Sequence, residues 1–401
     1  MNTAPERQKI VIVGGGFAGI ETARLLAKKH LAIDITLVSN NSDFHYYPNL
    51  YRLVVGASVH QAAVAVNEIL PSSVTVIIDT YTGIDQAAHT ITLQSDKTVP
   101  YDFLVMALGS EPNYFGIDGL AAHSKSFLSV EKALALKNYY SDLITACRTI
   151  PEEEARMSLH TIIVGAGPAG VELAGVLRPY LVQQAKVNGI NADMVTVDLL
   201  DSSPRLLPML PARASAKVQK QLQKKGVTFY ANHGVSACDE HCVTVVDKNI
   251  TPEVKKELHA GTVIWTAGTK ISSAFATIPG VEMTERKRVT VTPNLTLPQD
   301  DKIYIAGDGS GTPFSGLAQT AIDQGAYIAQ AIAYRVQNKL IAPYEPKQGV
   351  FVIPVGKYWA IFNYKDFVMS GHAAYFLRIM IDVRYFLRTA SIAHVFKMLR
   401  K

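Results

Sequence analysis

The chain has 401 residues, of which 48% are hydrophobic and 18% are charged. Such a chain can bury large cores and should divide into two or three domains, which excludes a disordered protein. Its three cysteines stand at no metal-ligand spacing, and this argues against a disulfide framework and fits a reducing compartment. No stretch reaches the roughly 18 consecutive apolar residues of a membrane-spanning helix, and the polar residues 1–9 predict no secretory signal. We therefore expect a cytoplasmic location.

The net charge of +5 (39 Lys and Arg against 34 Asp and Glu) is concentrated at the C-terminus. The charged residues from position 375 onward are Arg378, Asp382, Arg384, Arg388, Lys397, Arg400 and Lys401. Six of these seven are positive, so the rest of the chain is close to neutral. A nucleic-acid-binding protein needs a basic face on a folded domain, and we therefore expect no nucleic-acid partner.

Two segments repeat one design, in which a short apolar strand leads through a glycine-rich turn into a helix. In the first unit the strand is residues 10–13, the turn carries Gly14, Gly16 and Gly19, and the helix follows at 20–26. The second unit begins 151 residues later (165 − 14), and its parts are strand 160–164, glycines Gly165, Gly167 and Gly170, and helix 171–174. In a dinucleotide-binding turn, the first glycine makes the tight turn, the second admits a pyrophosphate, and the third packs helix on strand. A purely structural turn is the alternative, but two complete units favour two nucleotide sites.

The end of the second strand in each unit indicates the nucleotide, because an acid there accepts hydrogen bonds from the ribose hydroxyls. In the second unit, residues 195–200 end at Asp201, whose carboxylate would repel the 2′-phosphate of NADPH, so we predict NADH. Arg205 leaves NADPH open, and Asp201 could instead cap a loop. In the first unit, Ser39 and Asn40 stand in place of an acid and bind a ribose more weakly. This unit is therefore assigned to FAD, a larger ligand with contacts elsewhere.

Three later strands supply those contacts and the connections between domains. Two of them stop at Gly109 and Gly268, which suits a chain that crosses between nucleotide domains, and the third leads into Gly307 and Asp308, an acid that could hold a ribityl hydroxyl. The predicted fold is α/β with two Rossmann-like domains. Its parts are a discontinuous FAD-binding domain (1–115 and 290–345), an NADH-binding domain (116–289) and a C-terminal segment (346–401).

These features together resemble the two-dinucleotide flavoproteins of the pyridine nucleotide-disulfide reductase superfamily and, within it, the type II NADH:quinone oxidoreductases (NDH-2). The resemblance runs from residue 10 to about residue 340. Its marks are the segments 165–175 (GAGPAGVELAG), 81–85 (YTGID), 263–265 (VIW), 307–308 (GD) and 318–323 (AQTAID). The resemblance implies FAD and NADH as cofactors and a quinone as the electron acceptor.

The resemblance also implies catalytic roles for two residues. A Gln at the position of Gln319 lies beside the flavin and the quinone, and a Glu at the position of Glu172 lies near the nicotinamide and the flavin. From the sequence alone, Glu172 could instead stabilise the dipole of the first helical turn, and Gln319 could start a helix that packs on the flavin. The A-Q-x-A-x-Q signature is incomplete, because Asp323 takes the second Gln position and Gln324 follows it, which leaves the quinone pocket open.

The residues predicted to bind the two cofactors belong to the glycine turns and to the strand ends. They are Gly14, Gly15, Gly16, Phe17, Ala18, Gly19, Ser39, Asn40, Tyr81, Ala107, Gly109, Gly165, Gly167, Pro168, Ala169, Gly170, Glu172, Asp201, Gly268, Gly307, Asp308, Ala318 and Gln319. No metal site is predicted.

The region after the first unit, residues 42–51, contains no cysteine, whereas disulfide reductases of this fold need a redox cysteine near the flavin. We interpret Cys147, Cys238 and Cys242 as structural, the last two flanking a hairpin turn. Electrons must then pass directly from the flavin to an acceptor, which disfavours a sulfide:quinone oxidoreductase. His45 could donate a proton, but a single His beside three tyrosines is more often structural.

The C-terminal segment changes its pattern twice. Residues 350–363 alternate as a hairpin with Gly356 and Lys357 at its turn. After Gly371, apolar residues recur every three or four positions, as on one helix face with most Arg and Lys off it. The face comprises Phe376, Ile379, Met380, Val383, Phe386 and Leu387 and, after a break at 389–391, Ile392, Val395, Phe396 and Leu399. Such basic amphipathic helices can lie in a membrane interface; the alternative is packing on the protein's own core or on a partner subunit, as in a homodimer.

The sequence thus predicts an FAD-dependent NADH:quinone oxidoreductase of the respiratory chain that pumps no protons and lies on the cytoplasmic side of a membrane. Two alternatives stay open. A soluble NAD(P)H-dependent reductase would serve a protein acceptor such as a ferredoxin or rubredoxin, with the basic C-terminus docking an acidic partner. A binding protein similar to apoptosis-inducing factor would hold NADH and FAD without turnover, and no feature of the sequence specifically favours it.

Overall fold

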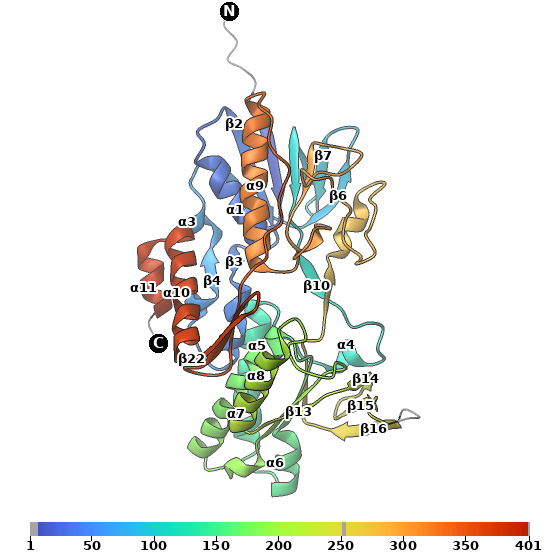
Figure 1. The fold of residues 1–401 in the computed structure, drawn as a ribbon, viewed down its shortest axis with the longest axis vertical. Coiled ribbons are helices and arrows are strands. Elements are labelled where there is room, and N and C mark those ends of the chain that lie inside the picture. The colour runs from blue at the N-terminus through green and yellow to red at the C-terminus, as the bar shows by residue number, and fades with distance from the viewer. Residues whose placement is uncertain (1–6, 251–253, 400–401) are drawn as a thin grey trace, which may run out of the picture.

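The computed structural model describes residues 7–250 and 254–399, which form two lobes along the long axis of the molecule (Figure 1). The upper lobe is built on a five-stranded sheet in the order β19-β9-β1-β2-β5, with every neighbouring pair parallel. Its strands are β1 (Gln8–Val13), β2 (Ile33–Ser39), β5 (Val74–Ile78), β9 (Phe103–Met106) and β19 (Ile303–Ile305). The central strands β9 and β1, the latter from residue 10 on, are continuous apolar runs, because both faces of the sheet are covered there.

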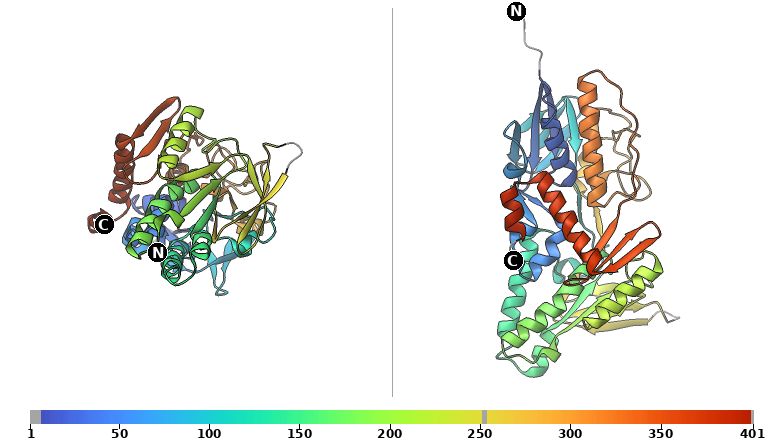
Figure 2. Two further views of the ribbon diagram at one scale, coloured as in Figure 1. Left: turned by 90° about the horizontal axis from the view of Figure 1, so that it is seen from below. Right: turned by 60° about the vertical axis from the view of Figure 1, so that its left-hand side comes forward.

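Two helices far apart in the sequence cover one face of this sheet side by side (Figures 1 and 2). They are α1 (Phe17–Ala27), which follows the first glycine turn, and α9 (Ala318–Val336). Gly325 on α9 permits their close approach, since a Cβ there would lie 2.5 Å from the carbonyl oxygen of Ala18. The upper lobe therefore joins the start of the chain to residues 300–336.

The lower lobe repeats this architecture with a four-stranded parallel sheet in the order β13-β12-β11-β17. The strands are β11 (His160–Val164), β12 (Thr196–Leu200), β13 (Val227–Tyr230) and β17 (Thr262–Trp265), and the main helices are α5 (Val130–Ala146), α7 (Pro168–Val187) and α8 (Ala212–Lys224). An antiparallel sheet is attached to this lobe, formed by β14 (His233–Cys238), β15 (Cys242–Asp247) and β16 (Val254–His259). The prediction that Cys238 and Cys242 flank a hairpin turn is confirmed.

The chain passes between the lobes through two short strands that pair with each other. β10 (Ser110–Pro112) follows Gly109, β18 (Thr269–Ile271) follows Gly268, and the two run antiparallel. The remaining elements are β3 (Asp43–His45), α2 (Leu50–Val54), β4 (Ala63–Ala65), α3 (Val66–Ile69), β6 (Tyr81–Asp85), β7 (Thr90–Leu93), β8 (Thr98–Pro100), α4 (Leu120–His123) and α6 (Glu152–Ser158). Both glycines thus stand where the chain leaves one lobe, as the sequence suggested.

The C-terminal segment runs along one side of both lobes (Figure 2, right). β20 (Phe351–Pro354) and β21 (Ala360–Tyr364) form the predicted hairpin, and β22 (Phe367–Gly371), which the sequence did not predict, adds a third antiparallel strand. Helices α10 (His372–Thr389) and α11 (Ile392–Leu399) follow, with the predicted break between them. Across residues 7–250 and 254–399, none of the helices combines the length and apolarity needed to span a membrane.

The predicted apolar face of α10 is divided in the structure. Phe376, Met380 and Leu387 are exposed, whereas Phe386, which we placed on the same face, is fully buried. The buried face of α10 also carries Arg378, one of the basic residues that the sequence pattern placed off the apolar face. Helix α10 therefore packs on the protein through the side that carries Arg378 and Phe386, and much of its predicted apolar face is exposed. Two of the basic residues counted above, Arg400 and Lys401, lie outside the described part of the chain.

Candidate dinucleotide sites and the contact between the lobes

The first glycine turn, between β1 and α1, has the geometry of a phosphate cradle. Gly14 has a φ of +112° and lies against the backbone of Ala107, where a Cβ would collide with the carbonyl oxygen. A Cβ on Gly19 would collide with the carbonyl oxygen of Gly14, so α1 packs closely on β1. A Cβ on Gly16 would have no protein atom within 4 Å. The middle position is therefore open at the N-terminus of α1, as a pyrophosphate requires.

The second turn, between β11 and α7, has the same geometry. Gly165 has a φ of +110°, and its Cβ would lie 2.6 Å from backbone atoms of Ala267. Gly170 packs against Gly165, and a Cβ on Gly167 would again have no protein atom within 4 Å. Two open positions in two equivalent turns fit two pyrophosphates, and the flanking residues Phe17, Ala18, Pro168 and Ala169 open the two helices.

Asp201 follows β12 at the carboxyl edge of the lower sheet, beside the second turn. Its Oδ2 accepts a hydrogen bond from the N–H of Ala166 at 2.6 Å, and its Oδ1 accepts one from Ser203 at 2.7 Å. Asp201 therefore does hold the loop, while its remaining lone pairs are free for a ribose. Arg205 donates to Leu210 and other groups of its own loop, which weakens the argument for NADPH.

In the first unit, the two residues at the end of β2 differ in exposure. Ser39 is buried under the turn, 2.5 Å from where a Cβ on Gly15 would lie, and its hydroxyl bonds the carbonyl of Asn41 at 2.8 Å. Asn40 is exposed at the edge of the cradle. Ser39 thus shapes the turn, and Asn40 is the one placed to reach a ligand.

The loop after β19 is held by Gln324. The N–H of Gly307 donates to its Oε1 at 2.7 Å, and Gln324 is fully buried. Asp308 accepts a hydrogen bond from Ser110 at 2.6 Å, which joins this loop to the strand that leaves the lobe. Asp323, at the second Gln position of the signature, turns away toward Tyr344, whose hydroxyl donates to it at 3.1 Å. Gln324 therefore holds the backbone of the predicted flavin-binding loop at Gly307.

Two predicted residues make contacts with other parts of the protein. Tyr81 is buried in the core beside the sheet of β6, β7 and β8, with its hydroxyl 2.7 Å from Thr277 Oγ1. Gln319, which follows Ala318 at the start of α9, is exposed, and its Oε1 accepts a hydrogen bond from the N–H of Val350 at 3.2 Å. Gln319 thus links α9 to the C-terminal segment, and its contact with a quinone stays a prediction.

Glu172, on the first turns of α7, is partly buried where α7 packs against α2, within the electrostatic reach of Arg378 on α10. Removal from water raises its pKa to about 8, and the positive charges of Arg378 and Arg52 offset this only in part. His45 is also buried, 3.8 Å from Glu131, and desolvation lowers its pKa. A carboxyl group with a pKa of about 8 holds its proton near neutral pH, so Glu172 can act as a proton donor.

Beside Glu172 lies an ion-pair cluster that the sequence analysis missed. Arg378 and Asp382, one turn apart on α10, are both buried and paired. Asp382 accepts a hydrogen bond from the Tyr46 hydroxyl at 2.8 Å, and Arg378 donates to Asn49 Oδ1 at 3.1 Å. Arg52 Nη2 lies 3.7 Å from Asp382. A signal existed in the i, i+4 spacing of Arg and Asp, but only the partners on the distant segment 46–52 show that this pair faces inward.

Aromatic contacts continue this attachment of α10 to the first turn. The ring of Phe17, the first residue of α1, lies 5.6 Å from that of Tyr385 on α10 and 5.7 Å from that of Tyr46. Buried Glu21 on α1 pairs with Arg388 at the end of α10. The C-terminal segment therefore contacts the predicted flavin helix directly.

Two equivalent cradles at the carboxyl edges of two parallel sheets define a protein of the class that binds two dinucleotides. Residues 8–325 match the pyridine nucleotide-disulphide oxidoreductase family, and the chain belongs to this family. The predicted fold class is confirmed. The predicted enzyme class and flavin cofactor are confirmed as well, because this is a family of FAD-dependent oxidoreductases.

Curated relatives are similar over nearly the whole chain. The type II NADH:quinone oxidoreductase Ndh of Mycobacterium tuberculosis is 28% identical over 399 residues, covering 95% of this chain and 85% of that protein. The type II NADH:quinone oxidoreductase of Staphylococcus haemolyticus is 27% identical, covering 98% and 99%.

Solved structures share the fold. NDH2 from Plasmodium falciparum in complex with NADH has a TM-score of 0.88 at 18% identity, covering 98% of this chain and 97% of that one. The sulfide:quinone oxidoreductase of Aquifex aeolicus has a TM-score of 0.79 at 21% identity, covering 96% and 92%. At these identities the likeness shows a common architecture.

Proposed function

We propose that the protein is a type II NADH:quinone oxidoreductase that works on a membrane surface. The observation that carries this proposal is the pair of open cradles at Gly16 and Gly167, with a protonated Glu172 at the contact of the lobes and no cysteine in residues 42–51. The relatives named type II NADH:quinone oxidoreductase support the acceptor. For the domains of the chain we propose the bounds expected from the sequence. They are an FAD-binding domain of 1–115 and 290–345, an NADH-binding domain of 116–289, and a C-terminal membrane segment of 346–401.

The two cradles would orient the cofactors by their pyrophosphates. The N–H groups at the start of α1 would hold that of FAD, and those at the start of α7 that of NADH. Asp308 and Asn40 would contact the flavin nucleotide, and Asp201 the ribose of NADH. When bound, FAD accepts a hydride from the nicotinamide and passes two electrons to the acceptor.

Glu172 would serve as the proton-holding group. Reduction of a quinone consumes two protons with its two electrons, and a carboxyl group with a pKa of about 8 is protonated at neutral pH. Its acidic O–H could therefore donate to a quinone oxygen. Gln319 would contribute an amide donor from the start of α9.

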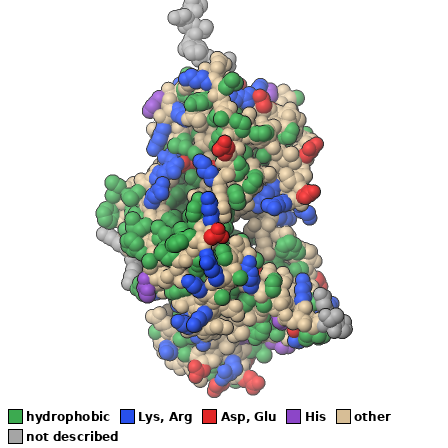
Figure 3. Space-filling view, in the orientation of Figure 1, with side chains coloured by type: hydrophobic (Ala, Val, Ile, Leu, Met, Phe, Trp, Pro, Cys, Tyr) green, Lys and Arg blue, Asp and Glu red, His purple; other side chains and the backbone are tan. Residues whose placement is uncertain are grey.

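The C-terminal helices would bring this site to the lipid that dissolves the quinone. Figure 3 shows apolar side chains gathered over α10 and α11, with Lys and Arg beside them. Exposed apolar residues of this surface are Phe376, Met380, Leu387, Ile392, Phe396 and Leu399. An apolar surface next to basic residues suits the interface of an anionic membrane, and we place it on the cytoplasmic leaflet.

The test is a purified preparation assayed for NADH oxidation with and without a short-chain quinone. We expect a yellow protein that oxidises NADH rapidly only when quinone is present. Oxidation that depends on a ferredoxin or rubredoxin, with slow rates for every quinone, would contradict the proposal. A colourless protein that takes up no flavin would contradict it as well.

A further inference from the structure

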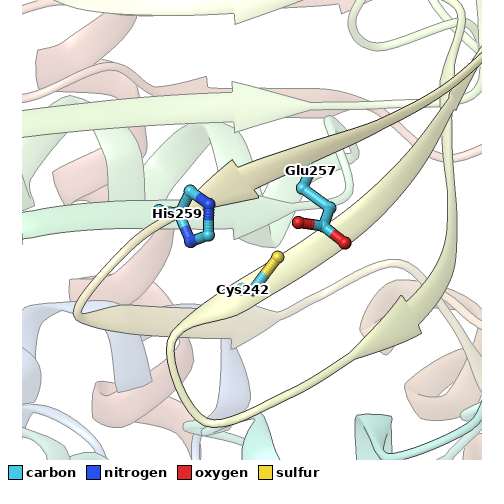
Figure 4. Close-up of side chains that lie close together, drawn as sticks. All are labelled: Cys242, Glu257 and His259. Atoms are coloured by element: carbon cyan, nitrogen blue, oxygen red, sulfur yellow. The ribbon is translucent and has the colours of Figure 1, made fainter.

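The exposed face of the antiparallel sheet in the lower lobe brings three metal-ligating side chains together (Figure 4). They are Cys242 on β15 and Glu257 and His259 on β16. The Cys242 sulfur, a Glu257 carboxylate oxygen and a His259 ring nitrogen all lie within 4.8 Å of one another. None of these residues belongs to either cradle or to the contact between the lobes.

The strand register holds this arrangement in place. Cys242 is directly opposite His259 in the antiparallel pair, and Glu257 stands two residues before His259, so the three side chains share one face. The other face of β15 carries Val243 and Val245, which are completely buried. A slip of the strands by one residue would expose these valines, so the burial of the inner face maintains the position of the three outer side chains.

The three side chains are available to a ligand. Glu257 and His259 are exposed, and the Cys242 sulfur, which has a backbone hydrogen bond with Leu258, is half-buried beside them. The carboxylate of Glu257 gives the cluster a negative charge that attracts a cation.

We propose that Cys242, Glu257 and His259 bind a divalent cation of the Zn²⁺ type through sulfur, oxygen and nitrogen, with water in the fourth position. Zn²⁺ accepts this mixture of ligands in tetrahedral geometry, whereas Mg²⁺ and Ca²⁺ prefer oxygen alone. The bound cation would hold the start of β15 to the end of β16, next to the turn that follows Cys238. It is independent of the proposed quinone reduction.

The test is a Co²⁺ titration of the untagged, full-length flavoprotein after dialysis against a chelator. Cobalt bound to a thiolate gives sulfur-to-metal charge-transfer absorption, and tetrahedral cobalt gives bands at longer wavelengths than the flavin. We expect one saturable equivalent that Zn²⁺ displaces. Cys242→Ser should abolish the charge-transfer band, and His259→Asn should weaken binding by about tenfold or more.

A matched control is His241→Asn, which changes an exposed histidine next to the site but outside the cluster. This variant should bind Co²⁺ as the unmodified chain does. Absence of saturable binding, or a charge-transfer band that survives in Cys242→Ser, would overturn the proposal. Glu257→Gln, at an exposed position, provides a second reading if Cys242→Ser does not fold, and unchanged affinity in that variant would exclude Glu257 as a ligand.

Discussion

At the scale of single residues, Glu172 has the environment of a proton donor. Its carboxyl group is partly withdrawn from water, and the two nearby arginines do not restore the ordinary pKa. A functional acid in a contact region between two nucleotide cradles commonly has its pKa shifted in this way. The acid is thus ready to release its proton near neutral pH, where an unperturbed Glu would already be ionised.

We expect Glu172→Gln to lower kcat for quinone reduction by about 10²-fold, because the amide has the same shape but no acidic proton. FAD content should not change, since the first cradle lies on the other lobe. Steady-state kinetics and flavin absorbance give the two quantities. An equal loss of both would mean that Glu172 supports the flavin site structurally.

The same side chain should make stability depend on pH. In the unfolded chain Glu172 ionises near its ordinary pKa of 4.5, and in the folded protein near 8. The folded state therefore retains a proton that the unfolded state has lost, and this residue's contribution to stability falls as the pH rises from about 4.5 to about 8. Thermal unfolding of the ligand-free protein should show the Tm of Glu172→Gln rising relative to that of wild type over this range. A constant Tm difference would contradict the raised pKa.

Asp201 combines a structural role with the predicted ribose contact. Asp201→Asn keeps one carbonyl oxygen for the turn but removes the charged acceptor, so we expect the KM for NADH to rise about tenfold with kcat little changed. Kinetics at varied NADH concentration measure this. Asp198→Asn, in the same strand but bonded to His160 at 3.0 Å, is the control and should leave KM unchanged. An unchanged KM in Asp201→Asn would remove this residue from the site.

At the scale of elements, each glycine turn contains one glycine that the fold requires and another that only a ligand would require. A Cβ at Gly16 or Gly167 meets no protein atom, and both residues have negative φ values of −82° and −72°, which alanine adopts. A Cβ at Gly19 or Gly170 would collide with backbone atoms. The fold therefore requires the last glycine of each turn, whereas only a bound ligand would require the middle one.

We accordingly expect Gly16→Ala to fold but to lose FAD, and Gly167→Ala to stay yellow but to bind NADH at least about tenfold more weakly. Circular dichroism, flavin absorbance and NADH titration separate these outcomes. Gly19→Ala is the contrasting variant and should fail to fold. Retention of FAD by folded Gly16→Ala would show that the pyrophosphate does not lie at this turn.

Helix α10 has a buried face and an exposed face, so its inner contacts and the proposed membrane contact must be tested separately. Its inner face buries Phe386 and the Arg378–Asp382 pair against the upper lobe. Breaking a buried pair costs about 3–5 kcal/mol. A chain that ends near Gly371 would lose these contacts, so substitutions on the outer face are the cleaner experiment.

At the scale of the whole molecule, the exposed apolar surface lies on α11 and on α10, the helix whose Tyr385 packs against Phe17 of the first turn. The triple variant Phe376→Ser, Leu387→Ser and Phe396→Ser should lose binding to anionic vesicles while keeping activity with a water-soluble quinone. All three side chains are exposed, so folding should not change. Vesicle sedimentation and NADH oxidation measure the two properties.

The control for this surface is Leu340→Ser, because Leu340 is 97% exposed and lies beyond the end of α9, away from the C-terminal helices. It should leave vesicle binding intact. If the full-length protein never sediments with anionic vesicles, the membrane role is wrong, and packing on a partner subunit becomes the better explanation of the exposed apolar side chains.

Much of the architecture could be predicted because its signals are local. Each signal occupies a short window of sequence. The signals are a glycine where the turn needs a positive φ, a glycine where a Cβ would collide with the turn, and an apolar strand of four or five residues. These windows identified both cradles, the strand ends at Gly109, Gly268 and Gly307, and the C-terminal hairpin. The third strand, β22, was not predicted, because its residues do not alternate between apolar and polar side chains.

By itself, then, the sequence located the two glycine turns and the strand and helix around each, since the spacing of the glycines is a local signal. Only the tertiary structure decided which face of α10 is buried, what surrounds Glu172, and that Cys242 meets His259. Arg378 and Asn49 are 329 residues apart in the chain, yet they share a hydrogen bond. Such contacts depend on how distant segments pack together, and no short window of sequence encodes that packing.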